Sequence, residues 1–362
     1  MAFNTEEGLG RGLHEEKEGK GKIMEQKIGS EGTPTSKALE YAQVAQAEIA
    51  RPGTNRQRRA DLQDDLRQLE RAHFVVVNGL NHYYQDEGPR DGETIIFVHG
   101  WDCSSFWWHS TVRALNAAGY RTINYDLRGH GFTDDPSDDD YTVLTMAQDL
   151  RALTSLLQLE KFHLLSFSIG SLVATAYTAQ HPESVASLAF FNYGLFEYNT
   201  RIEQVGPKLL ATIFSKVLRR FKAWRPVYAY VRLTLVKNPV SRRDIQYGML
   251  SLQDTSPRAA LHAARSAMSK EVLSQLPTWA ASLKMPALLV AGSDDKVISR
   301  KSSDKLAAIL PNCTYFVMPH CGHLILGELP DQVAALLKLH LERAKITELK
   351  VAEAVASYAT KA

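Results

Sequence analysis

The sequence has few cysteines and no long apolar run, and each shortage excludes a class of protein. Its three cysteines, Cys103, Cys313 and Cys321, are an odd number without CxxC or metal-ligand spacing. This pattern argues against a disulfide framework and a zinc site. No stretch approaches the roughly 18 consecutive apolar residues that a membrane-spanning helix needs. We therefore expect a soluble protein of a reducing compartment, with the cytoplasm as the default location.

The chain also lacks a strong charge and a signal peptide. The formal net charge is +2, so the overall balance indicates no nucleic-acid partner. Acidic residues such as Glu6, Glu7, Glu15 and Glu16 interrupt any apolar region at the N-terminus. Residues 1 to about 36 are poor in apolar residues and show no periodicity, so we expect them to be disordered.

The remaining pattern divides the chain into an extension, a core and an insertion. Residues 1–72 are the predicted extension, with two short helices near Lys37–Ala50 and Gln57–Arg71 after the disordered part. Residues 73–194 and 284–342 form the predicted core. Residues 195–283 read as helical and form a predicted cap, and residues 343–362 form a helical tail.

The predicted core alternates short runs of β-branched, aromatic and aliphatic residues with helical segments. This alternation is typical of an α/β protein with a largely parallel sheet. Eight strands are expected, at His73–Val77, Asn81–Gln85, Thr94–Val98, Arg121–Tyr125, Phe162–Leu165, Ser187–Phe191, Ala287–Val290 and Thr314–Val317.

The fifth predicted strand runs through a turn of small residues into a helix, and Ser168 lies at that turn. Such a turn strains the backbone of a nucleophile and has no room for large side chains two residues on either side. Ser166 and Gly170 occupy those positions. Ser166 is a weaker candidate nucleophile, because that choice would place Leu164 at a crowded position.

A serine hydroxyl needs a base and an orienting carboxylate to become a nucleophile. Asp294 and Asp295 follow the seventh strand, and His320 and His323 follow the eighth. His323, directly after Gly322, is the predicted base, with His320 as the alternative. Either aspartate could supply the carboxylate on position alone.

Acyl transfer also needs donors for the oxyanion of the tetrahedral intermediate. The backbone N–H groups of Trp101, after the third strand, and of Ile169, after Ser168, are the candidates. We interpret His99 as a brace for the loop that carries Trp101. Asp126 and Arg128 are expected to stabilise the loop after the fourth strand.

These motifs together resemble the α/β-hydrolase superfamily: the His-Gly loop, the Asp126–Gly131 segment, the Ser168 turn, the Gly292–Asp295 segment and Cys321–His323. The match covers roughly residues 73 to 340. The resemblance implies an eight-stranded, mostly parallel α/β-hydrolase sheet flanked by helices, with a helical cap after strand 6. It also implies Asp295 as the acid. The sequence departs from the family by having Ser166 where Gly is usual.

The resemblance implies a serine hydrolase, because relatives that act on epoxides or haloalkanes use Asp in place of Ser168. A carboxylic ester or thioester with a hydrophobic acyl or aromatic group is the expected substrate, cleaved through an acyl-enzyme. Carbon–carbon bond hydrolysis and perhydrolase chemistry remain alternatives, as does a non-catalytic ligand-binding homologue. No metal or organic cofactor is implied.

The predicted cap has one amphipathic helix, from Pro207 to Trp224, and a strongly basic composition. Between Gln204 and Arg243 there are ten Lys or Arg residues, Arg219 and Arg220 among them, and no acidic residue. A solvated face explains such a run most simply; an anionic membrane surface or an acyl carrier is the alternative. The expected substrate pocket is lined by Trp101, Phe106, Trp107, Trp108, Tyr228 and Tyr230.

Overall fold

The computed structural model describes residues 32–213, 229 and 231–359, and side chains as far as Lys345. Its centre is one eight-stranded sheet with the strand order β1-β2-β4-β3-β5-β6-β7-β8. The strands β1 and β2 join by antiparallel pairing, as do β2 and β4, and all later neighbours pair in parallel. The predicted mostly parallel sheet is confirmed.

All eight strands occupy the predicted places, and several are longer than expected. They are β1 His73–Val77, β2 Leu80–Glu87, β3 Thr94–Val98, β4 Arg121–Tyr125, β5 Phe162–Phe167, β6 Val185–Phe191, β7 Ala287–Gly292 and β8 Cys313–Met318. The central strands are buried on both faces because helices cover both.

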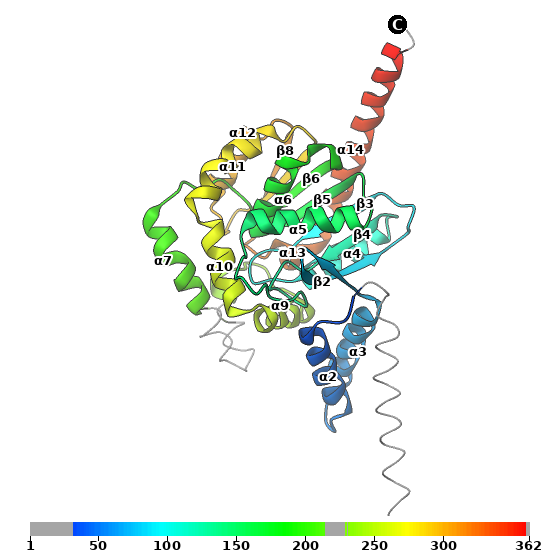
Figure 1. The fold of residues 1–362 in the computed structure, drawn as a ribbon, viewed down its shortest axis with the longest axis vertical. Helices are drawn as coiled ribbons and strands as arrows, with labels where there is room; N and C mark the ends of the chain where they lie inside the picture. The colour runs from blue at the N-terminus through cyan, green and yellow to red at the C-terminus, as the bar shows by residue number, and fades with distance from the viewer. Residues whose placement is uncertain (1–31, 214–228, 230, 360–362) are drawn as a thin grey trace, which may run out of the picture.

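Helices flank the sheet in two layers (Figure 1). In β5, Phe162 and Leu164 face one apolar core, which also contains residues of α5 (Val143–Leu156), α6 (Ile169–Gln180) and α12 (Arg300–Ile309). Leu165 and Phe167 face the other, shared with η1 (Ser105–Trp108), α4 (His109–Asn116), α13 (Ile325–Glu328) and α14 (Pro330–Ala359). This alternation is the period of two expected of a strand.

Helices begin where a short polar side chain caps them. Ser241 accepts a hydrogen bond from the third amide of α9 (Arg242–Asp254), and Ser256 does the same for α10 (Pro257–Ala267). With α7 (Thr200–Ala211) and α11 (Lys270–Ser282), these helices form the insertion between β6 and β7. The predicted helical insertion after strand 6 is confirmed, although α11 packs against α6 and contributes to the core.

The N-terminal hairpin, as we call α2 (Ser36–Ala50) and α3 (Arg56–Arg71), lies beside the sheet (Figure 1) and shares an apolar cluster with β1, β2 and α9. Both helices match the expected positions within a residue. Order begins earlier than residue 36, because Thr35 is buried and its hydroxyl donates to Phe132 O at 2.6 Å. The predicted disorder of residues 1–31 lies outside the described residues.

One further expectation, about where a helix begins, is wrong. The predicted amphipathic helix from Pro207 begins at Thr200 instead, where Asn199 caps α7, and Pro207 lies inside it. Leu209, expected on the apolar face of that helix, is 56% exposed. At the C-terminus, the predicted helical tail from residue 343 continues α14, which begins at Pro330. In the described part of the chain, no helix has the length and apolarity needed to cross a membrane.

Candidate active site

Ser168 lies at a sharp turn between β5 and α6, with φ 52° and ψ −122°. This backbone conformation is rare for a residue with a side chain, so it marks a strained position. Gly170 follows because a Cβ at that position would lie 2.3 Å from His99 O. The turn predicted from the sequence is therefore present, and it presents the half-buried Ser168 at the carboxyl edge of the sheet.

Asp295 and His323 meet beside this turn. His323 Nδ1 lies 2.8 Å from Asp295 Oδ2. Asp295 Oδ1 also accepts hydrogen bonds from the backbone amides of Val297 and Ile298, at 2.7 and 2.9 Å. With Nδ1 donating to the buried carboxylate, Nε2 of the imidazole is left to accept a proton, which is the tautomer a general base requires.

The structure distinguishes the alternative residues that the sequence left open. Asp294 pairs with Lys237 at 3.3 Å and accepts from Ser293, so it points away from His323. His320 occupies a turn with φ 51°, and its amide donates to Ser293 Oγ. Ser166 is buried and donates to Ser171 Oγ at 3.0 Å. Ser168 and His323 line one cavity, and Asp294, His320 and Ser166 are not among the residues that line it.

Asn192, which sequence reasoning missed, ties together the loops that carry the acid and the base. It directly follows β6 and is fully buried. Its Oδ1 accepts from the Gly292 amide at 2.8 Å, and its Nδ2 donates to Gly322 O at 3.1 Å and His323 O at 2.5 Å. A polar residue at the end of a buried strand was the signal that could have identified it.

Glu328 is a second supporting residue without an evident sequence signal. This buried carboxylate accepts from the Gly322 amide at 2.9 Å, just before His323. Its other oxygen accepts from the amides of Lys237 and Asn238 at 2.7 and 2.9 Å. Glu328 thereby holds the loop of His323 against the segment of the insertion that precedes α9.

The loop between β3 and η1 is braced as expected. Buried His99 accepts from the Leu127 amide through Nε2 at 2.9 Å, and its Nδ1 lies 2.8 Å from Gly100 O. Burial lowers the pKa of His99 to about 3, so the ring stays neutral. Asp126 accepts from the amides of Ser105 and Phe132, at 2.6 and 2.8 Å, as a structural residue would.

Arg128, expected to stabilise the same region, forms a buried pair with Asp149. Its Nε and Nη2 lie 2.7 and 2.8 Å from the two carboxylate oxygens. This two-point geometry is the strongest form of the ion pair.

Burial raises the pKa of Asp126 to about 6, while the hydrogen bonds that its carboxylate accepts from backbone amides oppose the rise.

Ser168 and His323 open into one cavity of about 500 Å³. Of the predicted pocket residues, Trp101 and Trp107 line it, together with the backbone donor candidate Ile169. Phe106 and Trp108 do not; they lie in the core, packed on Tyr247 and Phe97 at ring distances of 4.8 and 5.1 Å. Tyr228 and Tyr230 lie outside the described residues. The wall is mainly apolar, with Leu172, Phe196, Ile202, Leu210, Met268 and Leu273.

A family model of the alpha/beta hydrolase fold matches residues 93–330. The chain belongs to the α/β hydrolase fold family. It is 27% identical to the cis-3-alkyl-4-alkyloxetan-2-one decarboxylase of Shewanella oneidensis, over 74% of this chain and 86% of that one. It is 26% identical to the 2-hydroxy-6-oxononadienedioate/2-hydroxy-6-oxononatrienedioate hydrolase of Comamonas testosteroni, over 72% and 92%. A thermophilic esterase from Thermogutta terrifontis has the same fold, with a TM-score of 0.63 and 20% identity over 75% and 98%.

The largest cleft described in this α/β hydrolase is not the one that holds Ser168. It measures about 1230 Å³ and lies between the N-terminal hairpin and α9. Its wall contains none of Ser168, Asp295 and His323. Because the smaller cavity joins the strained serine to the paired histidine, it is the candidate active site. Within the described ranges, no group of three or more His, Cys, Asp or Glu side chains is arranged to hold a metal ion.

The basic run of the insertion is partly neutralised by acids from elsewhere in the chain. Lys237 pairs with Asp294 at 3.3 Å, and Arg242 with Asp61 at 3.6 Å. Arg243 binds Asp65, and Arg219 and Arg220 lie outside the described residues. The described residues of this run therefore favour the solvated or paired face over an anionic partner.

Proposed function

We propose that this α/β hydrolase is a serine hydrolase that cleaves a carboxylic ester or thioester with a hydrophobic acyl or aromatic group. The 2.8 Å contact between His323 Nδ1 and Asp295 Oδ2, at a cavity shared with the strained Ser168, carries the proposal. Ser168, Asp295 and His323 would be the nucleophile, the orienting acid and the base, in the chain order that the family uses.

In the proposed reaction, Ser168 Oγ attacks the substrate carbonyl while His323 Nε2 accepts the hydroxyl proton. The backbone N–H groups of Trp101 and Ile169 donate to the developing oxyanion. The intermediate collapses to an acyl-enzyme, and His323 returns the proton to the leaving alcohol or thiol. Water, deprotonated by His323, then attacks the acyl-enzyme and releases the acid and free Ser168. Asp295 keeps the imidazole oriented throughout.

The cavity wall supports a neutral acyl group. Its described charged residues, apart from His323, are the acidic Asp102, Glu197 and Asp244, and no Lys or Arg is among them. A carboxylate in the cavity would find no described cation of the wall to pair with, and its burial among apolar side chains would cost free energy. Carbon–carbon bond hydrolysis, suggested by the Comamonas relative, stays an alternative. The dianionic substrates in that relative's name would need cations, which the described wall does not supply.

The deciding experiment combines active-site labelling with paired variants. A fluorophosphonate should label Ser168 in wild type and fail in Ser168→Ala. We expect Ser168→Ala and His323→Ala to lose roughly 10³-fold or more in kcat on 4-nitrophenyl esters. Asp295→Asn should lose about 10²-fold or more. Asp294→Asn and Ser166→Ala are the matched controls, because both side chains point away from the reacting atoms; each should stay within about threefold.

A folded wild type that neither reacts with the fluorophosphonate nor cleaves any acyl ester or thioester would contradict the proposal and favour a non-catalytic binder. Equal losses in Asp294→Asn and Asp295→Asn would show the acid assignment to be wrong. Turnover of a neutral vinylogous diketone without turnover of esters would favour carbon–carbon bond hydrolysis on the same residues.

A further inference from the structure

Helix α9 forms one wall of the active-site cavity. Ile245, Gly248, Met249 and Leu252 of this helix all line it. Their spacing of three and four residues places them on a single face. A shift of α9 would therefore change the depth and width of the space available to the acyl group.

The opposite side of α9 contacts the N-terminal hairpin. Arg243 Nη2 lies 2.5 Å from Asp65 Oδ1 of α3. The Tyr247 hydroxyl donates to the same oxygen at 3.4 Å, and Gln246 Nε2 donates to Asp61 Oδ2 at 3.2 Å. The hairpin lies outside residues 93–330, which the family model matches. It contacts a wall of the pocket from outside that range.

The pair of Asp65 and Arg243 is built to hold a fixed position. Asp65 is 3% exposed, and its Oδ2 accepts from the Tyr41 hydroxyl of α2 at 2.6 Å. The Arg243 guanidinium also lies 4.5 Å above the Tyr247 ring. Removing one partner of such a buried pair leaves an uncompensated charge, so the contact resists displacement.

On its other side, α9 is held by the core. Asp244, adjacent to Arg243, lies 2.8 Å from His109 Nε2 of α4. A Cβ at Gly248 would lie 3.2 Å from the Trp107 ring, so the helix approaches η1 closely. The neighbouring residues Arg243 and Asp244 thus bind α9 to the hairpin on one side and to the core on the other.

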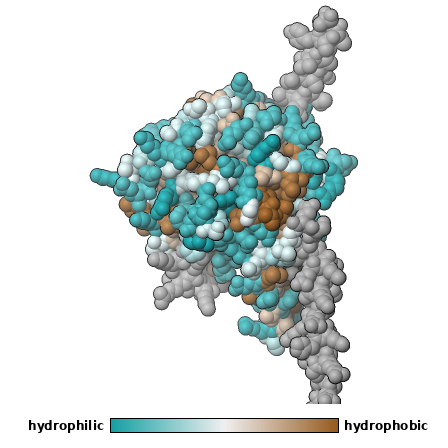
Figure 2. All heavy atoms as spheres, viewed as in Figure 1, coloured by the Kyte–Doolittle hydropathy of each residue, from teal (hydrophilic) through white to brown (hydrophobic). Residues whose placement is uncertain are grey.

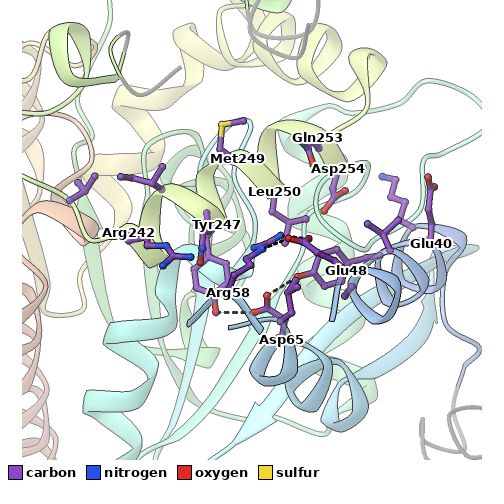
Figure 3. A pocket seen from close by; sticks show the side chains of 18 of the residues that line it. Glu40, Glu48, Arg58, Asp65, Arg242, Tyr247, Met249, Leu250, Gln253 and Asp254 are labelled. Carbon is purple, nitrogen blue, oxygen red and sulfur yellow. Dashed lines mark hydrogen bonds and ion pairs between the residues drawn. The ribbon is translucent and has the colours of Figure 1, made fainter. Parts of the chain in front are cut away.

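Tyr247 of α9 also packs in an apolar cluster with Ala38, Ala42 and Leu69 of the hairpin. Beside this contact, a cleft of about 1230 Å³ lies between α9 and the helices α2 and α3 (Figure 3). In Figure 3, Tyr247 of α9 points toward Asp65, while Arg58 and Glu48 pair within the hairpin. Val240, Ile245 and Met249 contribute to both this cleft and the active-site cavity. Because α9 separates this cleft from the active-site cavity, its contacts with the hairpin and with the core set the position of the wall.

We propose that the N-terminal hairpin determines acyl-chain specificity, because Asp65 fixes α9 through Arg243 and so sets the shape of the acyl pocket. Asp65, Tyr41 and Arg243 are positioning residues in this proposal, since none of them lines the cavity. The inference rests on the proposed hydrolase activity and names what selects the substrate of that site.

The test compares full-length variants on 4-nitrophenyl acetate and 4-nitrophenyl octanoate. Asp65→Asn and Arg243→Gln should each raise KM for the octanoate roughly tenfold, while kcat/KM for the acetate stays within about twofold. A hydrophobic pocket discriminates by about tenfold or more per methylene, so a displaced wall acts mainly on the long chain. Arg243→Lys should restore part of the preference. The double variant should match the single variants, because the two residues act through one contact.

Arg58→Gln is the matched control. It breaks the 2.9 Å ion pair between Arg58 and Glu48, which joins the two helices of the hairpin and does not involve α9. It should leave both esters unchanged. Tyr41→Phe removes only the hydroxyl that donates to Asp65, so it gives a milder variant if Asp65→Asn does not fold. It should shift the octanoate KM in the same direction.

A readout without turnover separates this inference from the proposed function. Binding of the neutral dye N-phenyl-1-naphthylamine, displaced by octanoate ester in Ser168→Ala protein, should weaken about tenfold in Arg243→Gln and remain unchanged in Arg58→Gln. If wild type cleaves no ester, the proposed function is wrong, and dye binding alone then tests whether the hairpin sets the shape of the pocket. Equal effects on short and long ligands, or none in folded Arg243→Gln and Tyr41→Phe, would overturn it.

Discussion

Asn192 should matter to both stability and catalysis, because one amide joins three backbone groups of two loops. In Asn192→Ala, the Gly292 amide and the carbonyls of Gly322 and His323 lose this partner inside the protein. Each buried group left unpaired costs about 1–3 kcal/mol, and the loops relax to recover part of this. We expect a loss of about 2–5 kcal/mol in the free energy of unfolding.

The catalytic effect follows from the same contacts. Without the Asn192 side chain, the loop of His323 loses its hydrogen bonds to the end of β6. Apart from that of the His323 ring, its contacts with the loop of Asp295 are then backbone and serine contacts. One of them is the 2.9 Å hydrogen bond from the Asp294 amide to Cys321 O. We expect kcat on a 4-nitrophenyl ester to fall by roughly 10- to 100-fold, because misplacement of a catalytic group by about 1 Å can cost that much. Urea unfolding followed by tryptophan fluorescence measures the stability, and steady-state kinetics measures kcat.

Asn124→Ala is the matched control. Asn124 is also buried, and its Nδ2 donates to Ser105 O at 2.8 Å, away from the active-site cavity. It should lower stability while kcat stays within about threefold. A fall in kcat of the same size in both variants would show that the effect of Asn192 is general destabilisation. Retention of kcat and stability in Asn192→Ala would refute the reasoning.

Asn192→Asp adds a pH-dependent version of this test. The new carboxyl keeps an acceptor for the Gly292 amide, but its second oxygen faces the carbonyls of Gly322 and His323 and can bond to one only when protonated. Folding should therefore raise its pKa above the unfolded value of about 3.9. The contribution is present below that value and is lost as pH rises, so the deficit against wild type should grow between pH 4 and pH 7.

Two other predictions concern acid and the N-terminus. Burial lowers the pKa of His99 to about 3 and that of His130 to about 4, so the stability that each contributes is present above an unfolded pKa of about 6.5 and is lost as pH falls. As pH falls, each of these two histidines should lower the free energy of unfolding by about 1.4 kcal/mol per pH unit. Below about pH 6, Asp126 should offset the effect of one histidine, because its pKa is raised. His130→Phe should make urea-measured stability fall less steeply from pH 7 to pH 5; an unchanged slope would contradict this. Deletion of residues 1–31 should leave ester hydrolysis and stability unchanged. Deletion of 1–37 should cost about 2–4 kcal/mol, because it removes the hydrogen bond of Thr35 and the 3.2 Å ion pair between Lys37 and Asp135; equal stability of the two deletions would refute it.

The face of the molecule in Figure 2 is mostly hydrophilic, with hydrophobic side chains in limited patches. Such patches are ordinary for a folded protein.

The strands and the Ser168 turn could be read from the sequence because their signals are local. A buried parallel strand needs a short apolar run, and the turn needs small residues at fixed offsets. Asp295 and His323 could be chosen because each follows a predicted strand, in the chain order that the family uses. The structure shows that these strands, β7 and β8, are parallel neighbours. The choice between Asp294 and Asp295 came from the family pattern, and the 2.8 Å contact to His323 agrees with it.

Contacts between distant segments were decided only by the tertiary structure. Of three consecutive aromatic residues, Trp107 lines the cavity, whereas Phe106 and Trp108 lie in the core. No local sequence pattern predicts which of them faces the cavity. The contacts of Asn192 and of Asp65 join loops and helices that are far apart in sequence, so only the packing shows which groups they bind. A sequence pattern reports the period and chemistry of its own segment. Which side chain meets which depends on how the segments pack, and that is determined by the whole chain.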